Sequence, residues 1–220
     1  VLDRIVPIGF DGTRGMSLLL YGQSATGKTT LWSSFPAPIL SMICSGGMSP
    51  GELLSVDTPA NRKRIQSVTL NDTSECREII DHARNGGGFK TLVLDHVSGL
   101  QDLTMKEILG LSELPAQKSW GLATQQQWGQ STAQCKEILR AMLNLVAASI
   151  NVVIIGQERE TRPEEGNELG IPTIGVATTP SLAGWINPAV DYICQTFKRP
   201  IMVEKETTLP NGKVLTTTSR

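Results

Sequence analysis

The length, composition and charge of the chain exclude several classes of protein. Its 220 residues suit one domain with a sizeable core, and 40% hydrophobic with 19% charged residues is typical of a globular chain. A formal net charge of −1 gives no overall attraction for nucleic acid or membranes, and the longest apolar runs are far shorter than the ~20 residues of a membrane span. No signal-peptide pattern opens the chain, and its four widely spaced cysteines favour reduced thiols, so we expect a cytoplasmic protein without membrane contact.

The first part of the chain alternates short apolar runs with a helical pattern. Ser17–Tyr21 is an apolar run that ends at a glycine, as buried parallel strands do. A glycine-rich loop follows, and Lys28–Phe35 is then predicted to be a helix that stops before a proline. Pro38–Cys44 is a second apolar run, whereas residues 45–64 are rich in Gly, Pro and Ser and are predicted to be a loop.

The middle of the chain repeats this alternation. Asp72, followed three residues later by a glutamate, is an N-cap signal for a helix that ends at Asn85–Gly88. Thr91–Leu94 is predicted to be a third strand, which runs directly into Asp95. The pattern over Val97–Leu111 predicts another helix.

The last part of the chain adds a long helix and a fourth strand. A polar stretch, Ser112–Gln127, precedes a helix whose apolar face reaches from Cys135 to Val146. Asn151–Gly156 is predicted to be the fourth strand, and residues 158–180 a long polar loop. The tail has strand character with a hairpin turn at Pro210–Gly212.

Strands that alternate with helices predict a parallel sheet covered on both faces. The expected fold class is therefore α/β, a three-layer α/β/α core with a mainly parallel sheet and a C-terminal β-hairpin. We expect an extension or linker over residues 1–14, the core over residues 15–200 and the hairpin over residues 201–220.

The loop after the first strand fits the phosphate-binding pattern G-x-x-x-x-G-K-[ST] at every fixed position. Its glycines let backbone N–H groups turn toward phosphate oxygens, and the next helix directs its N-terminus at the same anion. Lys28 is expected to reach the β- and γ-phosphates, and Thr29 to place its hydroxyl on Mg²⁺. We therefore predict a site for ATP or ADP with Mg²⁺, formed by Gly22, Gln23, Ser24, Ala25, Thr26, Gly27, Lys28, Thr29 and Thr30.

Two strand ends supply polar partners for this loop. Asp95, at the tip of the third strand, is a candidate Mg²⁺ ligand. Gln157 follows the fourth strand, where it would face the crevice in which open α/β sheets bind ligands. It is predicted to sense the γ-phosphate or to position a water. His96, beside Asp95, is expected to cap a loop rather than to act in catalysis.

The order of these segments resembles that of RecA-type ATPase cores, and more narrowly that of compact phage-encoded RecA-like proteins. The segments are GQSATGKTT after a strand, TLVLD, a Trp-Gly pair before a long helix, NVVIIGQE, Thr179–Gly184 and Val190–Tyr192. The resemblance spans roughly residues 15–200. It implies a role in homologous recombination or strand annealing, single-stranded DNA binding, and self-association into a filament or ring with ATP between subunits. It also implies DNA-facing loops at about Glu113–Gln127 and Arg159–Thr179, and the host cell cytoplasm as the location if a phage encodes the protein.

The chain departs from the RecA pattern at one catalytic position. Where RecA-like enzymes place a water-activating glutamate, the end of the second strand here has Ser45. Serine is a poor general base, and loss of a general base typically costs ~10²–10⁴-fold in rate. Glu158 or Glu52 could substitute, and we take Lys28, Gln157 and Glu158 as the catalytic candidates.

Basic and aromatic side chains that could meet DNA or a neighbouring subunit occur at four places: Arg159 with Arg162, Lys118 with Trp120 and Trp128, Asn61–Arg64, and Lys198–Arg199. The loop that holds Arg159 and Arg162 is acidic overall, which opposes contact with phosphates. The tryptophans could stack on bases or pack in a core or subunit contact. Lys198 and Arg199 could reach a neighbour's γ-phosphate.

Two functions remain open from the sequence. One is a DNA-dependent ATPase of the RecA type that acts on single-stranded DNA. The alternative is a nucleotide-gated scaffold or binding protein with weak or no hydrolysis, which Ser45 favours. A helicase or packaging motor is less favoured because no accessory domain is evident, and a small-molecule kinase because no arginine-rich lid is evident.

Overall fold

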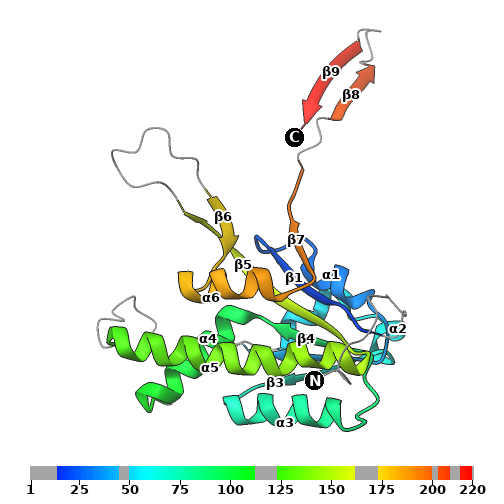
Figure 1. The fold of residues 1–220 in the computed structure, drawn as a ribbon. Helices are drawn as coiled ribbons and strands as arrows, with labels where there is room; N and C mark the ends of the chain where they lie inside the picture. Colours follow the sequence, from blue (N-terminus) through cyan, green and yellow to red (C-terminus); the bar gives the residue numbers. More distant parts are fainter. Residues whose placement is uncertain are drawn as a thin grey trace, which may run out of the picture.

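The computed structural model describes residues 14–44, 50–111, 123–161, 173–199, 203–208 and 214–219 (Figure 1). Its strands are β1 (Ser17–Gly22), β2 (Ile39–Ile43), β3 (Ile65–Thr69), β4 (Thr91–Asp95), β5 (Asn151–Thr161), β6 (Thr173–Val176), β7 (Tyr192–Thr196), β8 (Val203–Thr208) and β9 (Val214–Ser219). Its α-helices are α1 (Lys28–Ser33), α2 (Pro59–Arg62), α3 (Thr73–Arg84), α4 (Val97–Leu109), α5 (Gln125–Leu143) and α6 (Pro180–Ile186). Short 3₁₀ helices are η2 (Pro50–Val56), η4 (Asn144–Ala148) and η5 (Asn187–Ala189).

One mainly parallel sheet organises the core. Its strand order is β3-β2-β4-β5-β1-β7, with every one of these neighbours parallel, and β6 adds to β5 in antiparallel direction. The strand β5 lies between β1 and β4, so the carboxyl ends of all three meet at one edge. Ligands of open α/β sheets bind at this edge.

Both faces of the central strands β1, β2, β4 and the first part of β5 are buried, which is why these strands are largely apolar. On one face, Leu18, Leu20 and Val153 pack with Trp32 of α1. On the other face, alternate strand residues pack with the apolar sides of α3, α4, α5 and α6. Figure 1 shows α3, α4 and α5 together on that side. The predicted α/β class with three layers and a mainly parallel sheet is therefore confirmed.

Helix caps explain where two of the helices begin. Asp72 accepts a hydrogen bond from the Glu75 backbone N–H, as the sequence predicts, while the Glu75 carboxylate accepts from the backbone N–H of Asn71. The start of α5 was not predicted, because residues up to Gln127 were assigned to a polar stretch. Thr124 and Gln127 instead form a capping box, which satisfies the first N–H groups of a helix that opens with polar residues.

Two strand regions were not predicted from the sequence, and one of them lies inside a segment predicted as a loop. Residues 45–64 are followed by β3, an edge strand in which only Ile65 and Val68 are apolar, so that it lacks the run of a buried strand. Within residues 158–180, β5 continues to Thr161 and pairs with β6. Backbone pairing rather than side-chain burial holds this extension together, because its outer residues are exposed. Polar sequences of this kind give no strand signal.

The C-terminal strands β8 and β9 form the expected antiparallel hairpin, separate from the main sheet. The turn predicted at Pro210–Gly212 lies outside the described residues. Figure 1 shows this hairpin standing away from the core, beyond β7. The domain boundaries at residues 14 and 200 stay a prediction.

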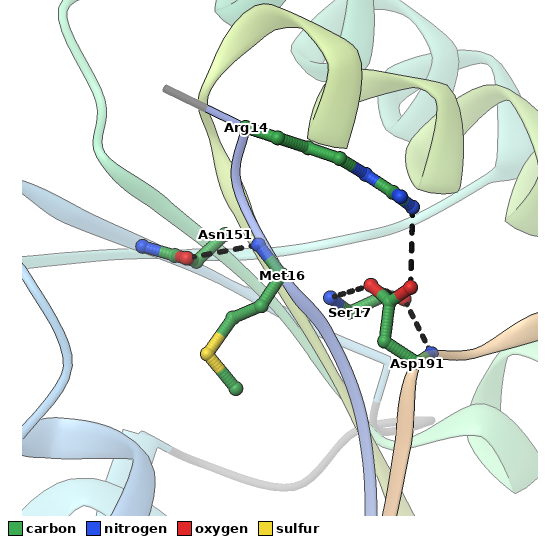
Figure 2. Close-up of polar contacts among 5 residues, drawn as sticks. All are labelled: Arg14, Met16, Ser17, Asn151 and Asp191. Atoms are coloured by element: carbon green, nitrogen blue, oxygen red, sulfur yellow. Dashed lines mark hydrogen bonds and ion pairs between the residues drawn. The ribbon is translucent and has the colours of Figure 1, made fainter. Parts of the chain in front are cut away.

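Asp191 attaches the start of β7 to the start of β1 (Figure 2). Its carboxylate accepts hydrogen bonds from the backbone N–H of Ser17 at 2.8 Å, from the Ser17 hydroxyl at 2.8 Å and from Arg14 Nη2 at 3.1 Å. Partial burial acts to raise the pKa of Asp191, but these hydrogen bonds and the Arg14 charge outweigh it and bring the pKa below its ordinary value. The carboxylate is therefore held in its charged form.

The four cysteines are free thiols in the structure, with Cys44, Cys76 and Cys135 buried and Cys194 exposed. Burial raises the pKa of Cys76 to about 12 and that of Cys135 to about 11, so both stay protonated at neutral pH.

In the part of the chain that the structure describes, no helix is long and apolar enough to cross a membrane.

Candidate nucleotide-binding site

The loop between β1 and α1 has the backbone that its glycines predict. Gly27, directly before α1, adopts φ 93°, a left-handed conformation that favours glycine. A Cβ atom on Gly22 would lie 2.3 Å from the carbonyl oxygen of Thr196 in β7, so no side chain fits there. The loop therefore passes close to β7 and turns sharply into α1.

Lys28 folds back onto this loop. Its Nζ donates hydrogen bonds to the carbonyl oxygens of Gly22 at 2.8 Å and Gln23 at 2.7 Å, and the residue is buried. Burial lowers the pKa of Lys28 below its ordinary value, and the negative charges of Asp95 and Glu158 oppose that shift. An ammonium group in this position can exchange the two carbonyls for phosphate oxygens.

A cavity of about 440 Å³ opens in front of the loop, at the carboxyl ends of β4 and β5. This volume lies within the ~300–1,000 Å³ of typical small-molecule sites. The cavity is lined by Ser24, Ala25, Gly27, Lys28, Thr29, Thr30, Ser55, Asp95, His96, Ile155 and Gln157. Six of the predicted loop residues thus meet Asp95 and Gln157 in one space, while Gly22, Gln23 and Thr26 are not part of its lining.

The sheet register explains why these residues meet. Gln157 of β5 lies beside Gly22 of β1, and Asp95 is the last residue of β4 on the other side of β5. A hydrogen bond from the Cys44 backbone N–H to the Asp95 carbonyl, at 2.6 Å, joins the ends of β2 and β4. The aspartate and the glutamine therefore come from two strand ends at the edge where the loop that leads to Lys28 leaves β1.

Glu158 occupies a different position from Gln157. One of its carboxylate oxygens accepts a hydrogen bond from Gln23 Nε2 at 3.2 Å, and the other accepts from Gln195 Nε2 at 3.0 Å. It does not line the cavity. Ser45, which takes the place of the expected glutamate, lies outside the described residues, as does the side chain of Glu52, the other residue that could substitute for that glutamate.

Three cavity residues, Ser55, His96 and Ile155, were not among the predicted site residues. Ser55 comes from η2, inside the segment that was assigned to a loop, and no sequence signal indicated it. His96 caps the N-terminus of α4 rather than a loop, because its Nδ1 accepts a hydrogen bond from the backbone N–H of Gly99 at 2.9 Å. It also lines the cavity, which its position directly after Asp95 could have indicated.

Gly99 allows α4 to begin this close to the site. A Cβ atom there would lie 1.6 Å from the carbonyl oxygen of Cys44, so only glycine fits. The N-terminus of α4, with His96 as its cap, consequently packs against the end of β2.

The other basic residues singled out in the sequence are dispersed. Arg62 pairs with nearby Asp57 at 2.6 Å, whereas Arg64 donates to the carbonyl oxygens of Ser33 and Phe35 at the end of α1, so both arginines have partners within the chain. Arg159, Lys198 and Arg199 are exposed. Trp128 is half-buried in α5, whereas Lys118, Trp120 and Arg162 lie outside the described residues.

Within the part of the chain described, no group of three or more His, Cys, Asp or Glu side chains could hold a metal ion.

Comparison with known proteins assigns the chain to a family. The sequence profile of the AAA domain family matches residues 14–217. Among solved structures, a KaiC-like protein from the archaeon Pyrococcus horikoshii aligns over 95% of each chain with 14% identity and a TM-score of 0.38. The flagellar accessory protein FlaH from Methanocaldococcus jannaschii aligns over 94% of this chain and 78% of its own with 10% identity and a TM-score of 0.42. No curated protein sequence matches the chain. Because the family profile covers nearly its whole length, the chain belongs to the AAA domain family.

Proposed function

We propose that the chain binds ATP with Mg²⁺ in the cavity beside α1 and hydrolyses it slowly. The observation that carries this proposal is the convergence of Lys28, Thr29, Asp95 and Gln157 on one cavity. These residues come from a phosphate-binding loop and two strand ends, and each offers a group that a nucleoside triphosphate requires. Membership of the AAA domain family supports a nucleotide-binding ATPase.

In this proposal the loop holds the phosphates. Lys28 would release the carbonyl oxygens of Gly22 and Gln23 and donate to the β- and γ-phosphates. The hydroxyl of Thr29 and the carboxylate of Asp95 line the same cavity, and such hard oxygen ligands suit Mg²⁺. The ion would neutralise the charge that develops on the phosphates. Thr29 and Asp95 are therefore the proposed metal ligands.

Gln157 is the residue best placed to orient an attacking water. It lines the cavity, whereas Glu158 does not and has an amide hydrogen bond on each carboxylate oxygen. Among the residues that line this cavity in the described part of the chain, Asp95 is the only carboxylate. Since Asp95 is assigned to Mg²⁺, no lining carboxylate remains for general-base catalysis, and we expect turnover reduced by ~10²–10⁴-fold relative to an enzyme that has one.

The same observation supports a second candidate function, a nucleotide-gated binding protein that hydrolyses ATP poorly or not at all. In such a protein, bound ATP stabilises the fold by about 2.7 kcal/mol at a hundredfold excess over Kd. Stabilisation without turnover would distinguish it from an ATPase.

We further propose that single-stranded DNA and other copies of the chain are its partners. Arg159 is exposed on β5, two residues after Gln157, so the part of β5 that extends beyond the cavity carries an exposed basic side chain. Among the described residues, β7 has β1 on one side and no strand on the other. Its side chains Tyr192 and Ile193 and the nearby Phe197 are 57%, 48% and 72% exposed. Exposed apolar residues on an open strand edge favour an interface with another subunit.

The test is ATP turnover with Mg²⁺, with and without single-stranded DNA, using Lys28→Ala as the blank. Turnover that rises with DNA and is abolished in Lys28→Ala would support a DNA-dependent ATPase of the RecA type. ATP binding with turnover equal to the blank would instead support the nucleotide-gated binding protein. If DNA changes neither turnover nor ATP affinity, the DNA partner is wrong.

A further inference from the structure

The end of β7 is in direct contact with the phosphate-binding loop. The Thr196 and Thr26 hydroxyl oxygens are 2.6 Å apart and share a hydrogen bond. Thr196 is also the register partner of Gly22, the first residue of the loop. The missing side chain of Gly22 is what allows this approach, because a Cβ there would collide with Thr196. The last residue of β7 is therefore packed against both ends of the turn that precedes Lys28.

A second contact runs from β7 to the loop through Glu158. Gln195 donates to one carboxylate oxygen of Glu158 at 3.0 Å, and Gln23 of the loop donates to the other at 3.2 Å. The carboxylate of Glu158 thus joins two amides that lie far apart in the sequence. Its charge also acts on Lys28, where it opposes the lowering of the pKa by burial.

The strand β7 is held at its other end as well. Asp191, immediately before β7, accepts hydrogen bonds from Ser17 and Arg14 (Figure 2). A strand of five residues that is held at both ends places Gln195 and Thr196 in fixed positions against the loop. Beyond Thr196, the chain leads through Phe197–Arg199 to the hairpin of β8 and β9 (Figure 1).

We propose that Gln195 and Thr196 are positioning residues for the phosphate-binding loop and that they couple nucleotide binding to the segment that follows β7. Lys28 bonds the carbonyl oxygens of Gly22 and Gln23, so moving its ammonium group to a phosphate alters the same turn that Thr196 and Gln195 hold. A displacement of the segment after β7 then changes nucleotide affinity, and bound nucleotide changes that segment by the same factor. This inference rests on the proposed nucleotide site.

The first arm of the test measures the Kd of Mg²⁺-ATP for Thr196→Val and Gln195→Leu. Each variant removes one hydrogen-bonding group and keeps a side chain of similar size. We expect each to weaken ATP binding about three- to tenfold, as loss of one hydrogen bond does. Thr196→Ser, which retains the hydroxyl, should restore the affinity. Cys194→Ser, which changes an exposed side chain of the same strand, is the matched control and should bind as the wild type does.

The second arm measures amide hydrogen exchange over residues 192–199. Saturating Mg²⁺-ATP should slow exchange in this segment of the wild type, and the effect should be lost in the double variant Gln195→Leu/Thr196→Val. Purely structural damage would lower the thermal midpoint without this selective loss. A midpoint measured for every variant separates the two effects.

The outcomes separate this inference from the proposed function. If wild-type protein binds Mg²⁺-ATP but Thr196→Val and Gln195→Leu bind it as Cys194→Ser does, the coupling is overturned and the site stands. The coupling is overturned in the same way if ATP leaves exchange over residues 192–199 unchanged in the wild type. If the wild type binds no ATP, the site itself is wrong and the coupling falls with it.

Discussion

Lys28 and Asp95 show how far single residues could be assigned from the sequence. The fixed spacing of the phosphate-loop pattern identified Lys28 and Thr29. Asp95 and Gln157 were identified by their positions at strand ends, because the carboxyl ends of parallel strands meet at one edge of a sheet. All four line the same cavity. The contacts of Glu158 with Gln23 and Gln195 were not predictable, because they join residues that are distant in sequence and depend on the register of β7.

At the residue scale, Gly99→Ala tests the close packing of α4 beside the site. The added methyl would lie 1.6 Å from the Cys44 carbonyl oxygen, so α4 or the end of β2 must shift. We expect a loss of about 1–3 kcal/mol in the free energy of unfolding, as overpacking produces, measured by urea denaturation. Gly129→Ala in α5 is the control, because a Cβ there meets nothing within 4 Å. Equal stability of the two variants would contradict the packing described for α4.

Among the elements, those with continuous apolar runs were predictable and those without were not. The strands β1, β2, β4 and β5 are buried on both faces, and their sequences carry that burial directly. The edge strand β3 and the antiparallel extension formed by β5 with β6 were missed, because backbone hydrogen bonds stabilise them and their side chains are largely polar and exposed. The start of α5 was missed because its first turn is polar and depends on a capping box.

At the element scale, the attachment of β7 to β1 should depend on pH. The pKa of Asp191 is lowered in the folded protein. The stabilisation that the Asp191 carboxylate contributes is therefore fully present above the unfolded-state pKa of about 3.9, and it is lost as the pH falls through the lower pKa of the folded state. Asp191→Asn removes the charge at every pH. We expect this variant to be less stable than the wild type at pH 7 and to approach it at the acidic end of a denaturation series. A constant difference in stability across that series would show that the carboxylate charge of Asp191 is not what attaches β7.

For the whole molecule, the class of fold was predictable but the order of strands was not. Alternating strands and helices indicated a parallel sheet with three layers. The pairing of β1 with both β5 and β7 joins Ser17 to Val152 and Leu18 to Tyr192, and nothing local in the sequence selects those partners. The same long-range pairings create the cavity and place β7 against the loop. The narrower resemblance to phage-encoded RecA-like proteins, the DNA partner and the self-association stay predictions.

We expect the cavity beside α1 to bind a nucleoside triphosphate through Lys28. Isothermal titration of Mg²⁺-ATP into the wild type, Lys28→Ala and Lys63→Ala tests this binding most directly. Lys63 is an exposed lysine at the C-terminal end of α2, and its variant serves as the control. Loss of a charge-assisted contact to phosphate should weaken binding about 10- to 100-fold in Lys28→Ala and leave Lys63→Ala equal to the wild type. Equal affinities for all three proteins, or no binding by the wild type, would show that Lys28 does not hold a nucleotide in this cavity.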